Sequence, residues 1–242
     1  MKSASSRRGP KTPDGLDQVY GVHALQSLLD RGEAPRELWV QQGAGSRLKE
    51  LVAHAQSHGA RVKEQPRDLL DQLTQGAAHQ GVVAFCPPLT PEGEESLWLK
   101  LRAWPSNTPP LLLILDGVTD VHNFGACLRS ADAAGAHGVI VAKDKAAPLN
   151  ATVRKVACGA AEVVPVYQVT NLARTLAKLK DAGVWITGTA GEAEASVFDI
   201  DMTGPTALVM GAEGKGMRRL TREACDNLAK LPMAGEVSSL NV

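Results

Sequence analysis

The feature that most constrains the fold is a regular alternation of short apolar runs with helical segments over residues 110–242. Continuous apolar strands that alternate with helices are typical of a mostly parallel sheet covered on both faces. We therefore predict an α/β domain for this part of the chain. The expected strands are Leu111–Leu115, Gly138–Val141, Glu162–Val166, Val184–Thr187, Ala207–Met210 and Leu228–Leu231, and the expected helices are Phe124–Ala134, Ala151–Cys158, Leu172–Asp181 and Arg218–Cys225.

A second, smaller α/β unit is predicted over residues 18–86. Apolar residues at helical spacing indicate a helix over 19–30, and Ser46 is a candidate cap for a helix that runs to about His58. Residues 87–109 are bounded by prolines, and we interpret them as a linker that contains a short docked helix. The basic, Ser- and Gly-rich residues 1–17 are expected to form a disordered arm. The unit's other expected elements are strands over 37–40, 60–63 and 81–86 and a helix over 66–73.

Composition excludes several classes of protein. The 242 residues include 26 basic and 26 acidic side chains, so the chain is not a uniformly basic nucleic-acid-binding protein. The apolar runs are too short to span a bilayer, the first residues lack the apolar core of a signal peptide, and the four cysteines form no CxxC pair. We therefore expect a cytoplasmic protein with reduced thiols and with neither a membrane nor a DNA partner.

Polar, glycine-rich stretches follow the predicted strands at 115–135, 188–192, 209–220 and 231–242. Ligands bind beyond the carboxyl ends of the strands in open parallel sheets, so these stretches mark the expected site. Neither a P-loop nor a GxGxxG turn is present, so the loops are expected to hold their ligand in another way. Tight turns without a ligand are the alternative explanation for the glycines.

Individual residues of these stretches are candidates for chemistry. Asn123 fits a helix N-cap, Arg129 follows it by six residues, and Glu213 lies between glycine-rich turns where it is placed to hold an arginine. A surface salt bridge for Arg129 and a solvated loop position for Glu213 are the alternatives. Asp116 and Asp120 are interpreted as turn residues.

Three ordered motifs, HNFGACLRSADAAGAHGVI, ALVMGAEGKGMRRLT and LPMAGEVSSLNV, resemble those of the SpoU (TrmH) family of SPOUT RNA ribose 2′-O-methyltransferases. The stretches VYGVHALQSLLD and LNATVRKVACGAAE resemble the subgroup that methylates a guanosine of 23S rRNA. The resemblance covers about residues 18–242. It implies a trefoil knot in residues 110–242, S-adenosylmethionine bound in the knot, and a homodimer. It also implies a ribosomal-protein-like RNA-binding module at 18–86 and a further helix after Val242 that completes the knot and the dimer face.

The resemblance also implies roles for particular residues, and no metal is expected. Arg129 would lower the pKa of the ribose hydroxyl and bind the neighbouring phosphate. We do not expect it to act as a general base, because a guanidinium in a protein stays protonated. The remaining catalytic candidates position the ribose or Arg129. The catalytic set is Arg129, Asn123, Glu213, Ser239 and Asn241, and the cofactor-binding set is Thr189, Gly211, Leu231, Met233 and Leu240.

The expected partner is 23S rRNA or a ribosome assembly intermediate. Aromatic residues make up only 4% of the chain, so we expect the RNA backbone rather than stacked bases to be read. One alternative function is a tRNA guanosine 2′-O-methyltransferase of the same family. The other is a non-catalytic RNA-binding or ribosome-assembly protein. The candidate phosphate contacts of the first unit are Arg36, Arg47, Lys49, Arg61 and Lys63.

Overall fold

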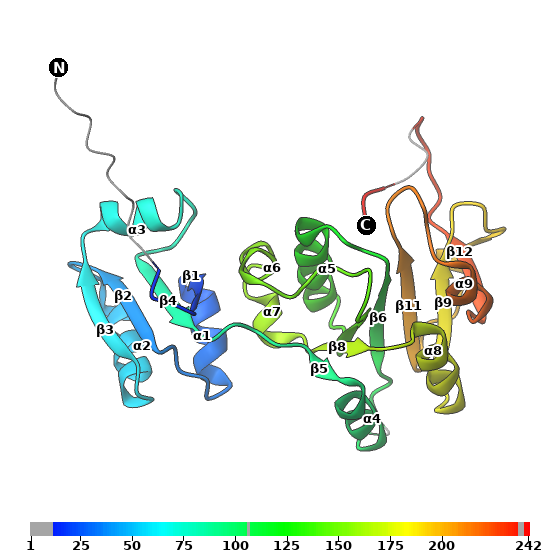
Figure 1. The fold of residues 1–242 in the computed structure, drawn as a ribbon, viewed down its shortest axis with the longest axis horizontal. Helices are drawn as coiled ribbons and strands as arrows, with labels where there is room; N and C mark the ends of the chain where they lie inside the picture. Colours follow the sequence, from blue (N-terminus) through cyan, green and yellow to red (C-terminus); the bar gives the residue numbers. More distant parts are fainter. Residues whose placement is uncertain (1–11, 106, 237–239) are drawn as a thin grey trace. The chain divides into compact units, whose positions relative to one another are not determined.

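A computed structural model of the chain describes residues 12–105, 107–236 and 240–242 (Figure 1). The chain divides into two compact units, Met1–Leu89 and Thr90–Val242. Most of the expected basic arm lies outside the described residues, and Asp17, which was assigned to it, begins a strand. None of the described helices is long and apolar enough to cross a membrane.

The first unit is a four-stranded sheet with the order β1-β4-β2-β3 and helices on both faces. β4 runs antiparallel to β1 and β2, whereas β2 and β3 are parallel. The elements are β1 (Asp17–Tyr20), α1 (Val22–Asp30), β2 (Glu37–Gln41), α2 (Ser46–Ser57), β3 (Arg61–Gln65), α3 (Arg67–Leu73) and β4 (Val82–Cys86).

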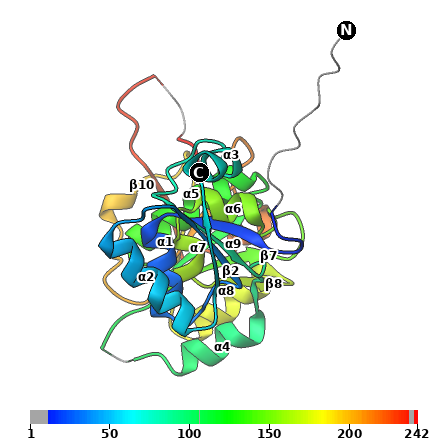
Figure 2. The same cartoon turned by 90° about the vertical axis from the view of Figure 1, so that its left-hand side faces the viewer.

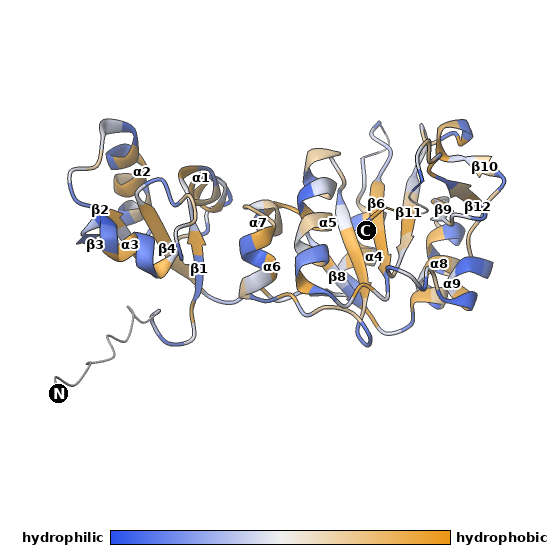
Figure 3. Ribbon diagram, turned by 90° about the horizontal axis from the view of Figure 1, so that it is seen from above, coloured by the Kyte–Doolittle hydropathy of each residue, from blue (hydrophilic) through white to orange (hydrophobic). Residues whose placement is uncertain are grey.

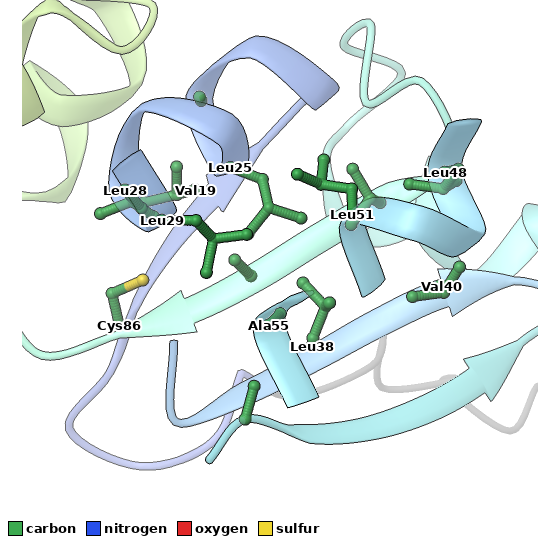
Figure 4. Close-up of a cluster of buried hydrophobic side chains, with 14 of the residues drawn as sticks. Val19, Leu25, Leu28, Leu29, Leu38, Val40, Leu48, Leu51, Ala55 and Cys86 are labelled. Carbon is green, nitrogen blue, oxygen red and sulfur yellow. The ribbon is translucent and has the colours of Figure 1, made fainter. Parts of the chain in front are cut away.

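The two faces of this sheet follow from the alternation of side chains along β2. Leu38 and Val40 pack against α1 and α2, which lie side by side (Figures 2 and 4). Trp39 points to the other face, where it packs with Phe85 and with Leu70 of α3. Burial of each such large side chain contributes about 1.5–3 kcal/mol, so both faces stabilise the unit.

Two local expectations for the first unit are wrong. Val19 belongs to β1 rather than to the first helix, because Gly21 adopts a φ of 97° and separates strand from helix. Ser46 is the first residue of α2 rather than its cap. Gly45 occupies the N-cap position, and no side chain caps the helix there.

The second unit is an eight-stranded sheet in which every neighbouring pair of strands is parallel, as expected. The strand order is β10-β12-β9-β11-β6-β7-β8-β5, and the central strands are strongly hydrophobic (Figure 3). The elements are β5 (Glu92–Gly93), α4 (Glu94–Arg102), β6 (Leu111–Asp116), α5 (Val121–Ala133), β7 (Gly138–Ala142), α6 (Ala151–Val156), α7 (Ala160–Val163), β8 (Val166–Val169), α8 (Leu172–Asp181), β9 (Trp185–Thr189), β10 (Ala195–Ser196), a 3-10 turn (Val197–Asp199), β11 (Thr206–Gly211), α9 (Arg219–Glu223) and β12 (Asn227–Lys230).

The order of the strands fixes where a ligand can bind. The chain moves from β6 to β7 in one direction across the sheet and returns from β8 to β9 in the other. Right-handed crossovers therefore place α5 and α8 on opposite faces. α4 and α8 bury Leu97, Leu172 and Leu176 on one face, and α9 contacts α8. The direction of winding changes between β6 and β11, so this is the switch point at which a crevice opens.

Two expectations for this part of the chain need correction. Residues 162–166 do not form a strand, because α7 occupies Ala160–Val163 and the strand begins only at Val166. Residues 90–105, expected within a linker, belong to the second unit, where the expected docked helix is α4 and buries Leu97. The path of the implied knot includes residues 237–239, which lie outside the described residues.

Candidate active site

A cavity of about 540 Å³ lies at the carboxyl ends of β9 and β11. Residues 189–192 line one side and residues 210–217 line another. Leu231, Met233 and the last three residues, 240–242, complete the wall. The cavity thus combines three of the polar stretches that the sequence places after strands, at the edge where a parallel sheet binds ligands.

The loop after β11 is tightly closed on itself. Ala212 and Gly216 exchange backbone hydrogen bonds of 3.1 and 2.8 Å. A Cβ atom on Gly211 would lie 2.2 Å from the Gly216 carbonyl carbon and from the Met217 nitrogen. Only glycine allows this approach, and Gly214 and Gly216 have φ values of 72° and 66°, which favour glycine. The motif's glycines therefore give the cavity wall its shape.

Asp116 of β6 holds Arg218, at the end of this loop, against the sheet. It is the last residue of β6, pairs in register with Gly211, and its side chain is fully buried. The Asp116 carboxylate accepts hydrogen bonds from the backbone nitrogen of Arg218 at 2.7 Å and from its Nε at 2.5 Å. The interpretation of Asp116 as a simple turn residue is wrong. The sequence signal for this structural role is an acidic residue at the end of an otherwise apolar strand.

The first turn of α5 lies beside Asn241, a residue of the cavity wall. Its N-cap is Asp120, whose side chain accepts hydrogen bonds from the backbone nitrogens of His122 and Asn123 at 2.8 Å each. The expectation that Asn123 is the cap is therefore wrong, because Asp120 is nearer the turn and has an equivalent acceptor. Asn123 instead accepts a hydrogen bond of 2.9 Å at its Oδ1 from Nδ2 of Asn241, which lines the cavity.

The structure brings together most of the residues singled out in the sequence. All five expected cofactor-binding residues line the cavity: Thr189, Gly211, Leu231, Met233 and Leu240. Glu213 and Asn241 line it as well. Arg129 is exposed on α5 and does not line the cavity, and no ion pair joins it to Glu213 among the described residues. Ser239 lies outside the described residues.

Further contacts brace the cavity from the β9 side. The Thr189 hydroxyl donates to the Val209 carbonyl at 3.1 Å, which ties the ends of β9 and β11 together. Glu192 forms an ion pair with Arg222 of α9 at the rim.

Cys225 lies just after α9. Burial raises the pKa of its thiol to about 11, and the neighbouring Asp226 adds to the shift. Cys225 is thus a packing residue at neutral pH.

The cavity residues fit S-adenosylmethionine. The volume lies within the range of about 300–1,000 Å³ that is usual for small-molecule sites. Leu231, Met233 and Leu240 supply apolar surface for an adenine ring, and the glycine-rich loop presents its backbone at close range. The wall carries charges of both signs, as an amino-acid tail with an ammonium and a carboxylate requires. These charged residues are Glu192, Glu213, Lys215 and Arg222, of which Glu192 and Arg222 pair with each other.

Family comparisons agree with this architecture. Residues 110–242 match the model of the SpoU rRNA Methylase family, and residues 18–92 match the model of the RNA 2′-O ribose methyltransferase substrate binding domain. The chain belongs to the SpoU methylase family. The two matches fall on the parallel-sheet region and on the small unit that the sequence distinguishes.

Relatives within the SpoU family match almost the whole chain. The 23S rRNA (guanosine-2′-O-)-methyltransferase RlmB of Pseudomonas putida is 56% identical over 94% of this chain and 91% of its own length. The protein of that name in Escherichia coli strain K12 is 53% identical over 93% of each chain. The SpoU methyltransferase AviRb of Streptomyces viridochromogenes, solved in complex with AdoMet, has a TM-score of 0.73 at 27% identity. It covers 94% of this chain and 85% of AviRb.

Proposed function

We propose that the protein transfers a methyl group from S-adenosylmethionine to the ribose 2′-hydroxyl of a guanosine in 23S rRNA. The observation that carries this proposal is identity above 50% to RlmB enzymes across both units of the chain. The cavity at the carboxyl ends of β9 and β11 supports it independently, because its lining fits the cofactor.

The cofactor, when bound, supplies an electrophilic methyl group on a sulfonium, whose sulfur retains the electron pair of the broken bond. The chain has to hold it, exclude water and align the ribose oxygen. The loops 189–192 and 210–217 and the segment from Leu231 would hold it. Alignment in a fixed site contributes at most about 7–11 kcal/mol to lowering the barrier, so positioning is the main task of these loops.

The ribose oxygen forms the new bond to carbon, and its proton passes to solvent. Arg129 lowers the pKa of that hydroxyl and holds the neighbouring phosphate, with the RNA strand lying between α5 and the cavity mouth. Asn123 and Asn241, already hydrogen-bonded to each other, position the ribose at this mouth. Ser239 would position the ribose as well, and Glu213 would orient Asn123 or Arg129.

The candidate phosphate contacts of the first unit belong to two surfaces. Arg47 and Lys49 are exposed on α2, whereas Arg61 and Lys63 are exposed on β3. Val62 packs toward the face that α2 covers, so its two neighbours point to the opposite face. Lys63 also pairs with Glu37 at 2.8 Å. We propose that Arg36, directly before β2, and Arg61, the first residue of β3, are the principal contacts from this unit.

We also propose that the enzyme acts as a homodimer. The family resemblance supports this assembly, and light scattering of the purified protein after gel filtration tests it directly. A mass near twice 25.5 kDa is expected. A monomer at concentrations where methylation proceeds would contradict it.

Methyl transfer from radiolabelled S-adenosylmethionine tests the proposed activity. In vitro transcribed 23S rRNA, assembling ribosomal particles and bulk tRNA serve as acceptors. Label that maps to one guanosine ribose of 23S rRNA is expected. Label in tRNA would favour the tRNA enzyme, and cofactor binding without transfer to any of these acceptors would favour a non-catalytic role.

Replacement of Arg129 by alanine tests the catalytic assignment. Because Arg129 does not line the cavity, the variant is expected to bind S-adenosylmethionine like the wild type and to lose turnover by about a hundredfold or more. Calorimetry and the methyl-transfer assay give the two values. Methylation at close to the wild-type rate would contradict the assigned role.

A further inference from the structure

A second hollow, of about 430 Å³, lies at the carboxyl ends of β7 and β8. The turn from β8 to α8 and the residues that open α9 line it. Lys145, Arg218 and Arg219 give it three cationic side chains, and Asp144 is the one acidic side chain among the residues that line it. The hollow therefore favours an anionic ligand.

Arg218 is held rigidly at this hollow. Its Nε and its backbone nitrogen both donate to the buried carboxylate of Asp116 at 2.5 and 2.7 Å. The Arg218 side chain remains 44% exposed, whereas that of Asp116 is fully buried. A guanidinium has five N–H donors in a fixed fork, so the four terminal donors remain for a ligand. Because the side chain is already ordered, binding costs little additional conformational entropy.

Lys145 and Arg219 add two exposed positive charges beside this fixed cation. Lys145 is exposed and lies at a backbone φ of 59°, and it forms no ion pair with any residue that the structure describes. Arg219 bonds Glu223 at 2.7 Å, but both side chains are more than half exposed. An exposed pair of this kind contributes about 0.2–1 kcal/mol, so a ligand can readily displace it.

The position of the hollow relates it to the active site. Arg218 directly follows Met217, which lines the cofactor cavity, so one short segment contributes to both sites.

We propose that this hollow binds a backbone phosphate of the RNA strand whose ribose is methylated. Arg218 is the fixed contact, and Lys145 and Arg219 are the flanking contacts. The inference rests on the proposed function, since it takes RNA as the ligand. The forked guanidinium suits a phosphodiester, and such contacts set the register of the strand without reading its bases.

The double variant Lys145→Gln/Arg219→Gln tests this site without altering the cofactor cavity. Its KM for RNA is expected to rise about tenfold, since charge-assisted hydrogen bonds are lost. The slope of log KM against log salt concentration should decrease by roughly one for each lost contact. Neither residue lines the cofactor cavity, so kcat at saturating RNA and the affinity for S-adenosylmethionine should remain at wild-type values.

The matched control is Arg174→Gln/Lys178→Gln. It removes the same charge from α8, where both side chains pair with Glu94, and it should leave the KM for RNA unchanged. Wild-type KM and salt slope in the first variant, or an equal change in the control, would overturn the proposal.

Fluorescence anisotropy with a 23S rRNA fragment separates the claim about this hollow from the claim about methyl transfer. If the wild-type protein binds RNA but transfers no methyl group, the proposed function is refuted. In that case, weaker RNA binding by Lys145→Gln/Arg219→Gln still supports the proposed phosphate site in the hollow.

Discussion

Asp116 is the residue whose role changes most between sequence and structure. Read along the chain, it is one of two aspartates in a loop. In the fold it is a fully buried carboxylate that fixes both the backbone and the side chain of Arg218, 102 residues later. The partner of Asp116 cannot be read from the local sequence, because it depends on the pairing of β6 with β11.

Replacement of Asp116 by asparagine is expected to weaken cofactor binding. The asparagine amide has one NH2 group where the carboxylate has a second acceptor oxygen. That NH2 group would face an N–H donor of Arg218, so one of the two hydrogen bonds is lost. Loss of a charge-assisted hydrogen bond costs about 1.5–3 kcal/mol, and we expect the dissociation constant for S-adenosylmethionine to rise about tenfold or more in calorimetry.

Asp226→Asn is the matched control for this variant. Asp226 also accepts a backbone hydrogen bond, from Ile186 at 2.9 Å, and pairs with Lys180 at 2.7 Å, but it does not line the cavity. Its replacement should leave cofactor affinity unchanged. Equal affinities in the two variants and the wild type would show that the loop does not need the Asp116 contact.

Thiol reactivity gives a second test at the residue scale. Burial raises the pKa of the Cys127 thiol to about 11, and that of Cys225 likewise, so almost no thiolate forms at pH 7.5. Cys158 is exposed. Under native conditions a maleimide followed by mass spectrometry should therefore label Cys158 well before the other two. Labelling of Cys127 at a comparable rate would contradict the packing of α5.

Elements whose hydrophobic period is clear could be predicted from the sequence, and those defined by tertiary contacts could not. The strands at Leu111, Gly138 and Ala207 and the helix at Leu172 are found within one or two residues of their expected bounds. The short strands β5 and β10 exist only through pairing with β8 and β12. The local sequence of Glu162, Val163 and Val164 predicts a strand, but Glu162 lies in α7, where it is buried against Arg154 of α6.

The same limits apply to the candidate site. The five residues that the family resemblance assigns to the cofactor line one cavity, but their contact with a cofactor stays a prediction. The cap of α5 was assigned to Asn123 instead of Asp120, since both residues are good caps and only the fold decides between them. Arg129 is on the expected helix, but its place outside the cavity lining follows from the packing of α5.

α5 depends on a glycine for its contact with α6. A Cβ atom on Gly125 would lie 2.6 Å from Cβ of Val156 and 3.0 Å from the Val153 carbonyl oxygen. Gly125→Ala should therefore lower the free energy of unfolding of the second unit by about 1–3 kcal/mol in urea denaturation, because the overpacking outweighs the better helix propensity of alanine.

Gly204→Ala is the control for this substitution. No atom lies within 4 Å of a Cβ built on Gly204, so its replacement should change stability by less than about 0.5 kcal/mol. A Gly125→Ala protein as stable as the control would show that α5 and α6 are less closely packed than described.

At the scale of the whole molecule, each unit has its own hydrophobic core. Leu38 and Val40 belong to the core of the first unit, and Ile114, Ile140 and Val209 belong to that of the second. This division matches the division of labour in the proposal, in which the first unit holds rRNA and the second holds the cofactor and carries out the transfer.

Replacement of Leu38 by alanine tests the independence of the two cores. Leu38 is completely buried, so the substitution should cost the first unit about 2–5 kcal/mol. In calorimetry of the full chain we expect one unfolding transition to move to lower temperature and the other to stay. Affinity for S-adenosylmethionine should be retained, and a parallel shift of both transitions would contradict separate cores.

Hydrogen–deuterium exchange of the wild-type chain with and without S-adenosylmethionine tests the central claim most directly. The claim is that the cofactor binds where β9, β11 and the C-terminal segment meet. We predict that the cofactor slows exchange in residues 189–192 and 210–217, at Leu231 and Met233 and in residues 240–242, and leaves the first unit unchanged. Protection confined to other segments, or none at saturating cofactor, would contradict the account.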